Sequence, residues 1–252
     1  MSNHQRRLRA GWLILLVVLL ATAMPIPAHA VTDRLPDLKM SYPRFFSVDT
    51  TTIAGHRLLR FTTIIPNAGV GPFEVHGRRS STSASTMSVA QVVYDDAGGR
   101  HEVATSDTMV YDVGDGHNHW HLKWLASYKL LNSGGSVVAT SPKIGFCFYD
   151  GELWYSGLPG TPASRVYPSS GCGTTTSLEV RTGLSVGWAD RYPYSVGHQW
   201  IDITNISDGT YRVRVTADAR NYFLETNNVN NSNYADVKIQ GTTVTVLGQG
   251  PR

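Results

Sequence analysis

Three histidines stand at alternate positions in the run His117-Asn118-His119-Trp120-His121. Alternate residues of an extended segment share one face, so this spacing aims the three imidazoles in one direction. Imidazole binds copper, zinc, iron and nickel, and no cysteine lies nearby to favour zinc or an iron–sulfur cluster. Because a regular strand would spread the rings over about 13 Å, we expect a bend or loop here. The run indicates a transition-metal site; the alternative is a histidine-rich surface loop.

The N-terminus has the three parts of a secretory signal peptide. Arginines precede an apolar segment at 12–23, which is short for a membrane span, and Ala28-His29-Ala30 matches a cleavage site. We therefore expect a signal peptide over residues 1–30 and a mature chain over 31–252. The alternative is an uncleaved membrane anchor.

The charge of the mature chain is balanced. The leader holds three of the 22 basic residues and no acidic residue, which leaves 19 basic against 19 acidic residues. Nucleic-acid binding usually needs a concentrated basic surface, so we expect no nucleic-acid partner. We also expect no membrane contact once the signal is cleaved.

Cys147 and Cys172 are the only two cysteines. In an exported chain such a pair predicts one disulfide, although two free thiols are the alternative. The bond would close a loop of about 25 residues and contribute roughly 3 kcal/mol by the loop-entropy relation.

Short segments with alternating apolar and polar residues recur along the mature chain, separated by turns rich in Gly, Asn and Asp. No helical periodicity appears beyond the leader. We therefore predict an all-β chain, a single β-sandwich-like domain with long irregular loops at 77–86 and 156–176. The expected strands are 57–65, 88–94, 125–131, 136–139, 200–204, 211–215, 236–239 and 242–247.

Longer motifs resemble the catalytic domain of the lysyl oxidases, which are copper-dependent quinone amine oxidases. The resemblance is strongest at Gly183-Leu-Ser-Val-Gly-Trp-Ala-Asp-Arg-Tyr192 and His198-Gln-Trp-Ile-Asp-Ile-Thr204. It also covers the histidine run and the segment that ends at Cys147. These blocks are more specific than the histidines alone. The resemblance implies a lysyl oxidase-like catalytic domain over 31–252.

Site residues follow from this resemblance position by position. His117, His119 and His121 match the copper ligands. Lys143 and Tyr192 match the lysine and tyrosine that condense into lysine tyrosylquinone. Copper and dioxygen oxidise the phenol ring, and the neutral lysine amine then adds to it. Lys143 must therefore lose its proton, which burial or a neighbouring cation would favour.

The implied reaction begins when the electrophilic quinone captures a primary amine and a base removes the α-proton. Asp190 is the candidate base, although it could instead accept a hydrogen bond from a loop amide. Hydrolysis releases an aldehyde, and dioxygen restores the cofactor with release of hydrogen peroxide and ammonia. The expected substrate is a lysine-bearing protein or a small primary amine, with dioxygen as co-substrate.

A calcium site is also implied, between the Pro-Asp-Leu segment near residue 37 and an Asn-rich loop near residue 230. Carboxylate, amide and backbone oxygens are the ligands that calcium prefers. A plain Asn-rich turn is the alternative. The matching positions are Asp37, Leu38 through its carbonyl, Glu225, Asn227, Asn230 and Asn231.

This chain departs from the family pattern in two places. Gly116 stands where the family has a cysteine, and the segment between Lys143 and Tyr192 is longer than expected. The leading hypothesis is a secreted protein-lysine 6-oxidase-like copper enzyme. The alternatives are a non-catalytic extracellular copper-binding β-sandwich and a zinc or iron enzyme of another class.

Overall fold

Antiparallel strands make up the fold in this computed structural model, which describes residues 30–112, 118–142 and 145–251. The described residues contain no α-helix and one 3-10 helix, Ser169–Cys172. None of their helical segments could span a membrane. Residues Val31–Arg252 form one compact unit, whereas the expected signal peptide lies outside the described residues except for Ala30.

The central sheet is built around β3, whose nine residues are all buried. We call it the β3 sheet; its order is β10-β12-β3-β13, and β2 also pairs with β3. Its strands are β2 (Arg44–Asp49), β3 (Leu58–Pro66), β10 (Glu152–Leu153), β12 (Trp188–Tyr192) and β13 (Trp200–Asp202).

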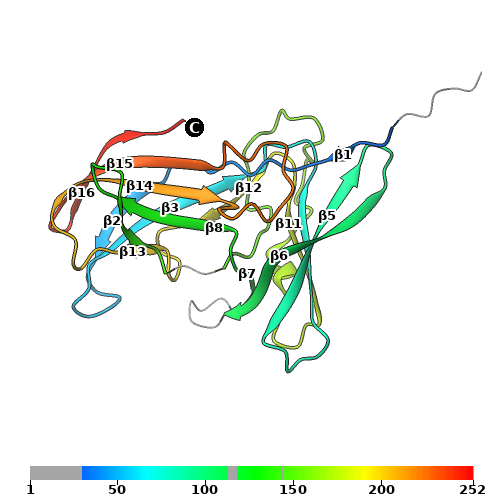
Figure 1. Cartoon of the computed structure of the whole chain (residues 1–252), viewed down its shortest axis with the longest axis horizontal. Coiled ribbons are helices and arrows are strands. Elements are labelled where there is room, and N and C mark those ends of the chain that lie inside the picture. Colours follow the sequence, from blue (N-terminus) through cyan, green and yellow to red (C-terminus); the bar gives the residue numbers. More distant parts are fainter. Residues whose placement is uncertain (1–29, 113–117, 143–144, 252) are drawn as a thin grey trace, which may run out of the picture. The chain divides into compact units, whose positions relative to one another are not determined.

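A second sheet, the β14 sheet, covers one face of the β3 sheet (Figure 1). The Phe61 and Tyr128 rings meet edge to face with centroids 5.4 Å apart, and the Tyr128 hydroxyl bonds Thr63 Oγ1 at 2.9 Å. These contacts join the two layers through a mainly apolar core. The sheet runs in the order β16 (Thr243–Gln249), β15 (Ser232–Gln240), β14 (Gly209–Ala217), β8 (Ala126–Leu131) and β9 (Val137–Thr140).

A third sheet, the β5 sheet, carries the predicted metal-binding segment at its edge. Its order is β11-β4-β5-β6-β7, and the short β1 pairs with β5. Its strands are β1 (Asp33–Arg34), β4 (Phe73–Arg78), β5 (Thr86–Asp95), β6 (Arg100–Asp112), β7 (His119–Leu122) and β11 (Glu179–Leu184).

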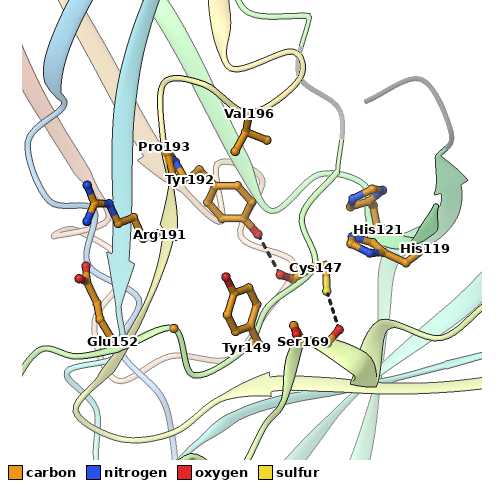
Figure 2. Close-up of a pocket in the computed structure, with 11 residues that line it drawn as sticks. His119, His121, Cys147, Tyr149, Glu152, Ser169, Arg191, Tyr192, Pro193 and Val196 are labelled. Atoms are coloured by element: carbon orange, nitrogen blue, oxygen red, sulfur yellow. Dashed lines mark hydrogen bonds between the residues drawn. The ribbon is translucent and has the colours of Figure 1, made fainter. Parts of the chain in front are cut away.

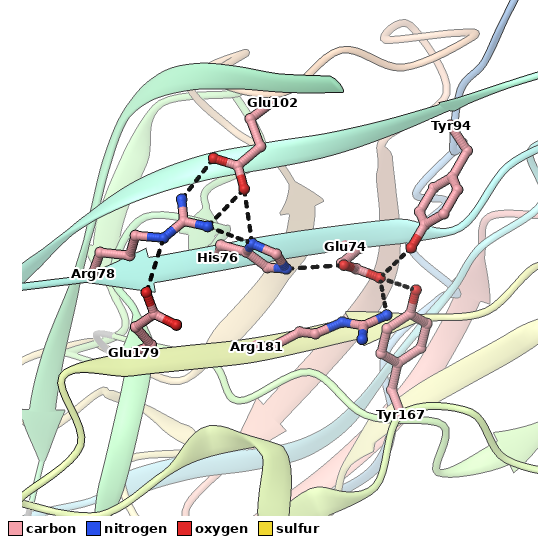
Figure 3. Close-up of polar contacts among 8 residues, drawn as sticks. All are labelled: Glu74, His76, Arg78, Tyr94, Glu102, Tyr167, Glu179 and Arg181. Carbon is pink, nitrogen blue, oxygen red and sulfur yellow. Dashed lines mark hydrogen bonds and ion pairs between the residues drawn. The ribbon is translucent and has the colours of Figure 1, made fainter. Parts of the chain in front are cut away.

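A buried carboxylate fastens the long loop before β11 to this sheet (Figure 3). Glu74 accepts hydrogen bonds from Tyr167 at 2.6 Å, Arg181 at 2.8 Å and Tyr94 at 2.9 Å. Burial alone would raise the pKa of Glu74, but these hydrogen bonds hold it below its usual value. Tyr167 belongs to the loop, so the network fixes the loop near the candidate site.

The all-β prediction is confirmed, and each expected strand is found with its ends shifted by a few residues. The two successive strands predicted at 200–204 and 211–215 belong to different sheets, because β13 pairs with β3 and β14 pairs with β8 and β15. The strands missed from the sequence include β4, β6, β11 and β12. The segment 156–176 is irregular apart from its 3-10 helix, as expected.

The predicted disulfide is present, and it joins Cys147 to Cys172 with their Cα atoms 5.8 Å apart. Cys172 belongs to the 3-10 helix, so the bond ties the long loop to the segment that precedes β10.

We predict that the Cys147→Ser/Cys172→Ser double variant loses about 3 kcal/mol of unfolding free energy, because the unfolded chain regains the entropy of a loop of 25 residues. For a chain of this size the melting temperature should fall by roughly 6–12 °C. Thermal unfolding followed by circular dichroism measures the change, with the reduced wild type as control. An unchanged melting temperature in both samples would contradict the prediction.

Candidate active site

Two of the three histidines in the predicted metal site lie on one face of β7. His119 and His121 have ring centroids 4.5 Å apart, while Trp120 between them is buried and donates from Nε1 to the Thr174 carbonyl at 2.8 Å. The regular strand starts at His119, and Asn118 before it has a φ of +50°, so the chain turns where we expected a bend.

His117 lies outside the described residues. Among the residues that are described, no three His, Cys, Asp or Glu side chains are grouped as ligands of a metal ion. The two described imidazoles suit copper by donor type and by their shared direction.

The segment after Lys143 packs directly against the histidine strand. Phe146 and Leu122 exchange both backbone hydrogen bonds at 2.9 Å. Gly145 has a φ of +104°, and a Cβ there would lie 2.5 Å from the Cβ of His121. This close approach therefore requires glycine. Lys143 itself lies outside the described residues.

Tyr192 is held at the end of β12 by packing and by its hydroxyl group. The side chain is buried, and its ring meets the Phe146 ring edge to face with the centroids 5.0 Å apart. Its hydroxyl group donates a hydrogen bond to the Cys147 carbonyl at 3.0 Å. Burial raises the pKa of Tyr192 well above its usual value, and the charge and hydrogen bond of Asp190 raise it further. The phenol is therefore protonated at neutral pH.

Asp190 is fully buried and precedes Tyr192 by two positions on β12, so both side chains lie on one face of the strand. Burial raises the pKa of Tyr149, and the negative charge of Asp190 raises it further. The predicted base and the predicted quinone precursor thus lie next to each other.

The histidines and Tyr192 line one cavity of about 490 Å³. Figure 2 shows the histidines on one side and Tyr192 with Tyr149 in the middle. A cavity of this volume suits a small ligand. Cys147 of the disulfide also lines the cavity, and the lining residues that sequence patterns did not indicate are Tyr149, Gly151, Glu152, Ser169, Arg191, Pro193 and Val196.

The predicted calcium positions come together from the two ends of the domain. Asn230 Nδ2 donates to Asp37 Oδ1 at 2.9 Å, and Asn231 Nδ2 donates to Glu225 Oε1 at 2.7 Å. The Leu38 amide donates to Glu225 Oε2 at 2.5 Å. Asp37, Glu225, Asn230 and Asn231 therefore lie in one cluster, and Leu38 joins it through its amide, whereas its carbonyl was the predicted ligand.

Asn227 is the exception. Its side chain is exposed, and its Oδ1 accepts a hydrogen bond from the Val229 amide at 3.0 Å, which makes a local turn.

The cluster has the donor set for a cation. Burial raises the pKa of Glu225 to about 8, because the opposing hydrogen bonds do not offset the loss of solvent. The Oδ1 atoms of Asn230 and Asn231 are buried without a hydrogen-bond partner among the described residues. These acceptor oxygens fit a hard cation such as calcium.

Fold and cavity together define an all-β protein with paired imidazoles beside a buried tyrosine. A model of the lysyl oxidase family matches residues 96–248, and the chain belongs to this family. Lysyl oxidase homolog 2 of Xenopus tropicalis is 28% identical over 188 residues, which is 73% of this chain. Lysyl oxidase homolog 3A of Danio rerio is 30% identical over 129 residues, which is 51% of this chain.

The matched regions cover only 19% of the first relative and 16% of the second. The chain thus spans about a fifth or less of the length of these relatives. Family and fold agree with the resemblance that the motifs carry.

Proposed function

We propose that this protein is a secreted copper-dependent amine oxidase that converts primary amines, peptidyl lysine among them, to aldehydes. Each turnover would consume one amine, one dioxygen and one water, and release one aldehyde, one ammonia and one hydrogen peroxide. The observation that carries the proposal is the cavity shared by His119, His121 and Tyr192, in a chain of the lysyl oxidase family.

In this proposal His117, His119 and His121 bind copper, and Lys143 and Tyr192 form the lysine tyrosylquinone cofactor. Copper and dioxygen would supply the oxidation of the phenol ring, and the finished quinone would supply the electrophile and the electron sink. Gly145 lies close to His121, and Lys143 precedes Gly145 by two residues. This proximity supports the assignment of Lys143 to the same site as the histidines.

The protein's own residues would then position the substrate and move its proton. The Cys147 carbonyl and the Phe146 ring fix the orientation of the Tyr192 ring. Asp190 would accept the proton from the α-carbon of the amine, because it is the buried carboxylate next to that ring. Burial of these groups keeps bulk water away from the reacting atoms.

Secretion is part of the proposal. The leader expected at residues 1–30 and the disulfide both suit an oxidising compartment outside the cytoplasm.

Copper loading in air followed by a hydrogen peroxide assay tests the function. With n-pentylamine as substrate, the loaded protein should release hydrogen peroxide and aldehyde in equal amounts, and the copper-free protein should release neither. Copper binding without either product would favour the non-catalytic copper-binding alternative.

We also propose that the cluster of Asp37, Leu38, Glu225, Asn230 and Asn231 binds calcium and ties the first segment of the domain to its last loop. The buried acceptor oxygens described above support this assignment.

Calcium should stabilise the fold, because an ion that binds only the folded state adds about 2.7 kcal/mol at a hundred times its dissociation constant. We predict that calcium raises the melting temperature by roughly 5–10 °C and that a chelator reverses the rise. Asp37→Asn should remove most of this effect, whereas Asp33→Asn, a change of the same type at an exposed position, should retain it. Equal calcium responses in both variants would refute the assignment.

A further inference from the structure

Glu152 is an acidic residue of the candidate cavity that the proposed chemistry does not use. It lies on β10, opposite Ala189 of β12, and lines the cavity together with Tyr149 and Tyr192. In Figure 2, Glu152 and Arg191 lie across the cavity from the two histidines, with both tyrosines between them.

One carboxylate oxygen of Glu152 lacks a hydrogen-bond partner among the described residues. Its Oε1 atom is shielded from solvent and accepts no hydrogen bond from any described residue. A buried carboxylate oxygen without a partner is costly, and such groups in folded proteins usually meet a ligand, an ion or water. Glu152 itself lines the cavity, and a carboxylate in a cavity wall favours a cationic ligand.

Arg191 lines the same cavity and is a candidate for a partner within the protein, but no ion pair within 4.0 Å joins the two described side chains. The Arg191 guanidinium instead lies over the exposed Phe45 ring, 5.9 Å from its centroid. Phe45 has a φ of +57°, an uncommon conformation for a bulky residue, so the local backbone holds the ring in this position at a cost.

The negative charge of Glu152 acts on Tyr149, another residue that lines the cavity. Burial and Asp190 raise the pKa of Tyr149, and Glu152 adds to this rise. Along β12, the position opposite Glu152 is three residues from Tyr192, or about 10 Å of strand. Glu152 is therefore remote from Tyr192 along the sheet, although both residues line one cavity.

We propose that Glu152 binds a second cationic group of the substrate, so that the enzyme prefers diamines over monoamines of the same length. This inference rests on the proposed amine oxidase function. The first amine would reach the Tyr192 ring, and the distal ammonium would meet the Glu152 carboxylate. Arg191 would oppose the same ammonium from the exposed side of the cavity.

Cadaverine and n-pentylamine test the proposal, because they share five carbons and one amine and differ in the distal ammonium. The wild type should show a higher kcat/KM for cadaverine. Glu152→Gln should lower this preference at least about tenfold, mainly through KM, because a charge-assisted contact is lost. Arg191→Gln should increase the preference.

Glu179→Gln is the matched control, since Glu179 is 77% exposed on β11 and outside the cavity. It should leave the preference unchanged. An equal preference in the wild type and in Glu152→Gln would overturn the proposal.

Calorimetry separates this inference from the oxidase function. Cadaverine should bind the copper-free full chain at least about tenfold more tightly than n-pentylamine, and Glu152→Gln should abolish the difference. If cadaverine binds in this way while no amine is oxidised, the proposed function fails and the role of Glu152 stands. If both amines bind equally, the role of Glu152 fails whatever the activity.

Discussion

We expect Tyr192→Phe to abolish amine oxidation, because the quinone cannot form without the phenol oxygen. The kcat should fall by at least about a thousandfold. The variant should still fold, since phenylalanine retains the packing on Phe146 and loses only the hydroxyl group, with its hydrogen bonds to Cys147 and Asp190. Hydrogen peroxide release from n-pentylamine measures the loss.

Tyr194→Phe is the control for this experiment. Tyr194 is two residues further along and 46% exposed, and it does not line the cavity. Its variant should oxidise amines at the wild-type rate. Substantial activity in Tyr192→Phe, or equal losses in both variants, would show that Tyr192 is not the cofactor precursor.

His119→Ala and His121→Ala should each weaken copper binding by at least about a hundredfold, because a metal ligand contributes at least as much as the groups that support it. Activity should fall with copper content, since the quinone needs copper to form. Metal analysis after dialysis against a weak chelator measures the first effect, and hydrogen peroxide release measures the second.

His101→Gln is the matched control for copper, because His101 is an exposed histidine of β6 whose ring nitrogen lies 3.8 Å from Asp33. It should bind copper as the wild type does. His121 is buried and lines the cavity. Full copper content in His121→Ala would show that this imidazole is not a copper ligand.

Local spacing predicted that the histidines share a face, whereas Asp190 and Tyr192 were assigned from the family resemblance. His119 and His121 share a face because side chains alternate along a strand, and Asp190 and Tyr192 do so for the same reason. The alternation does not identify a partner strand. The sequence therefore could not indicate that β13 and β14 belong to different sheets.

Contacts between distant segments could not be predicted from local sequence patterns. Glu152 enters the cavity only because the two-residue strand β10 pairs with β12, and so short a strand has no detectable periodicity. The contact of Asp37 with Asn230 joins positions 193 residues apart, and only the family resemblance suggested it. Gly145 shows its role only in the close approach to His121.

A peptide mass map after aerobic copper loading tests the proposed covalent link between Lys143 and Tyr192. We expect the two peptides to be recovered as one oxidised, cross-linked species that Tyr192→Phe and copper-free samples lack. Separate, unmodified Lys143 and Tyr192 peptides from a fully copper-loaded protein would show that the quinone cofactor does not form.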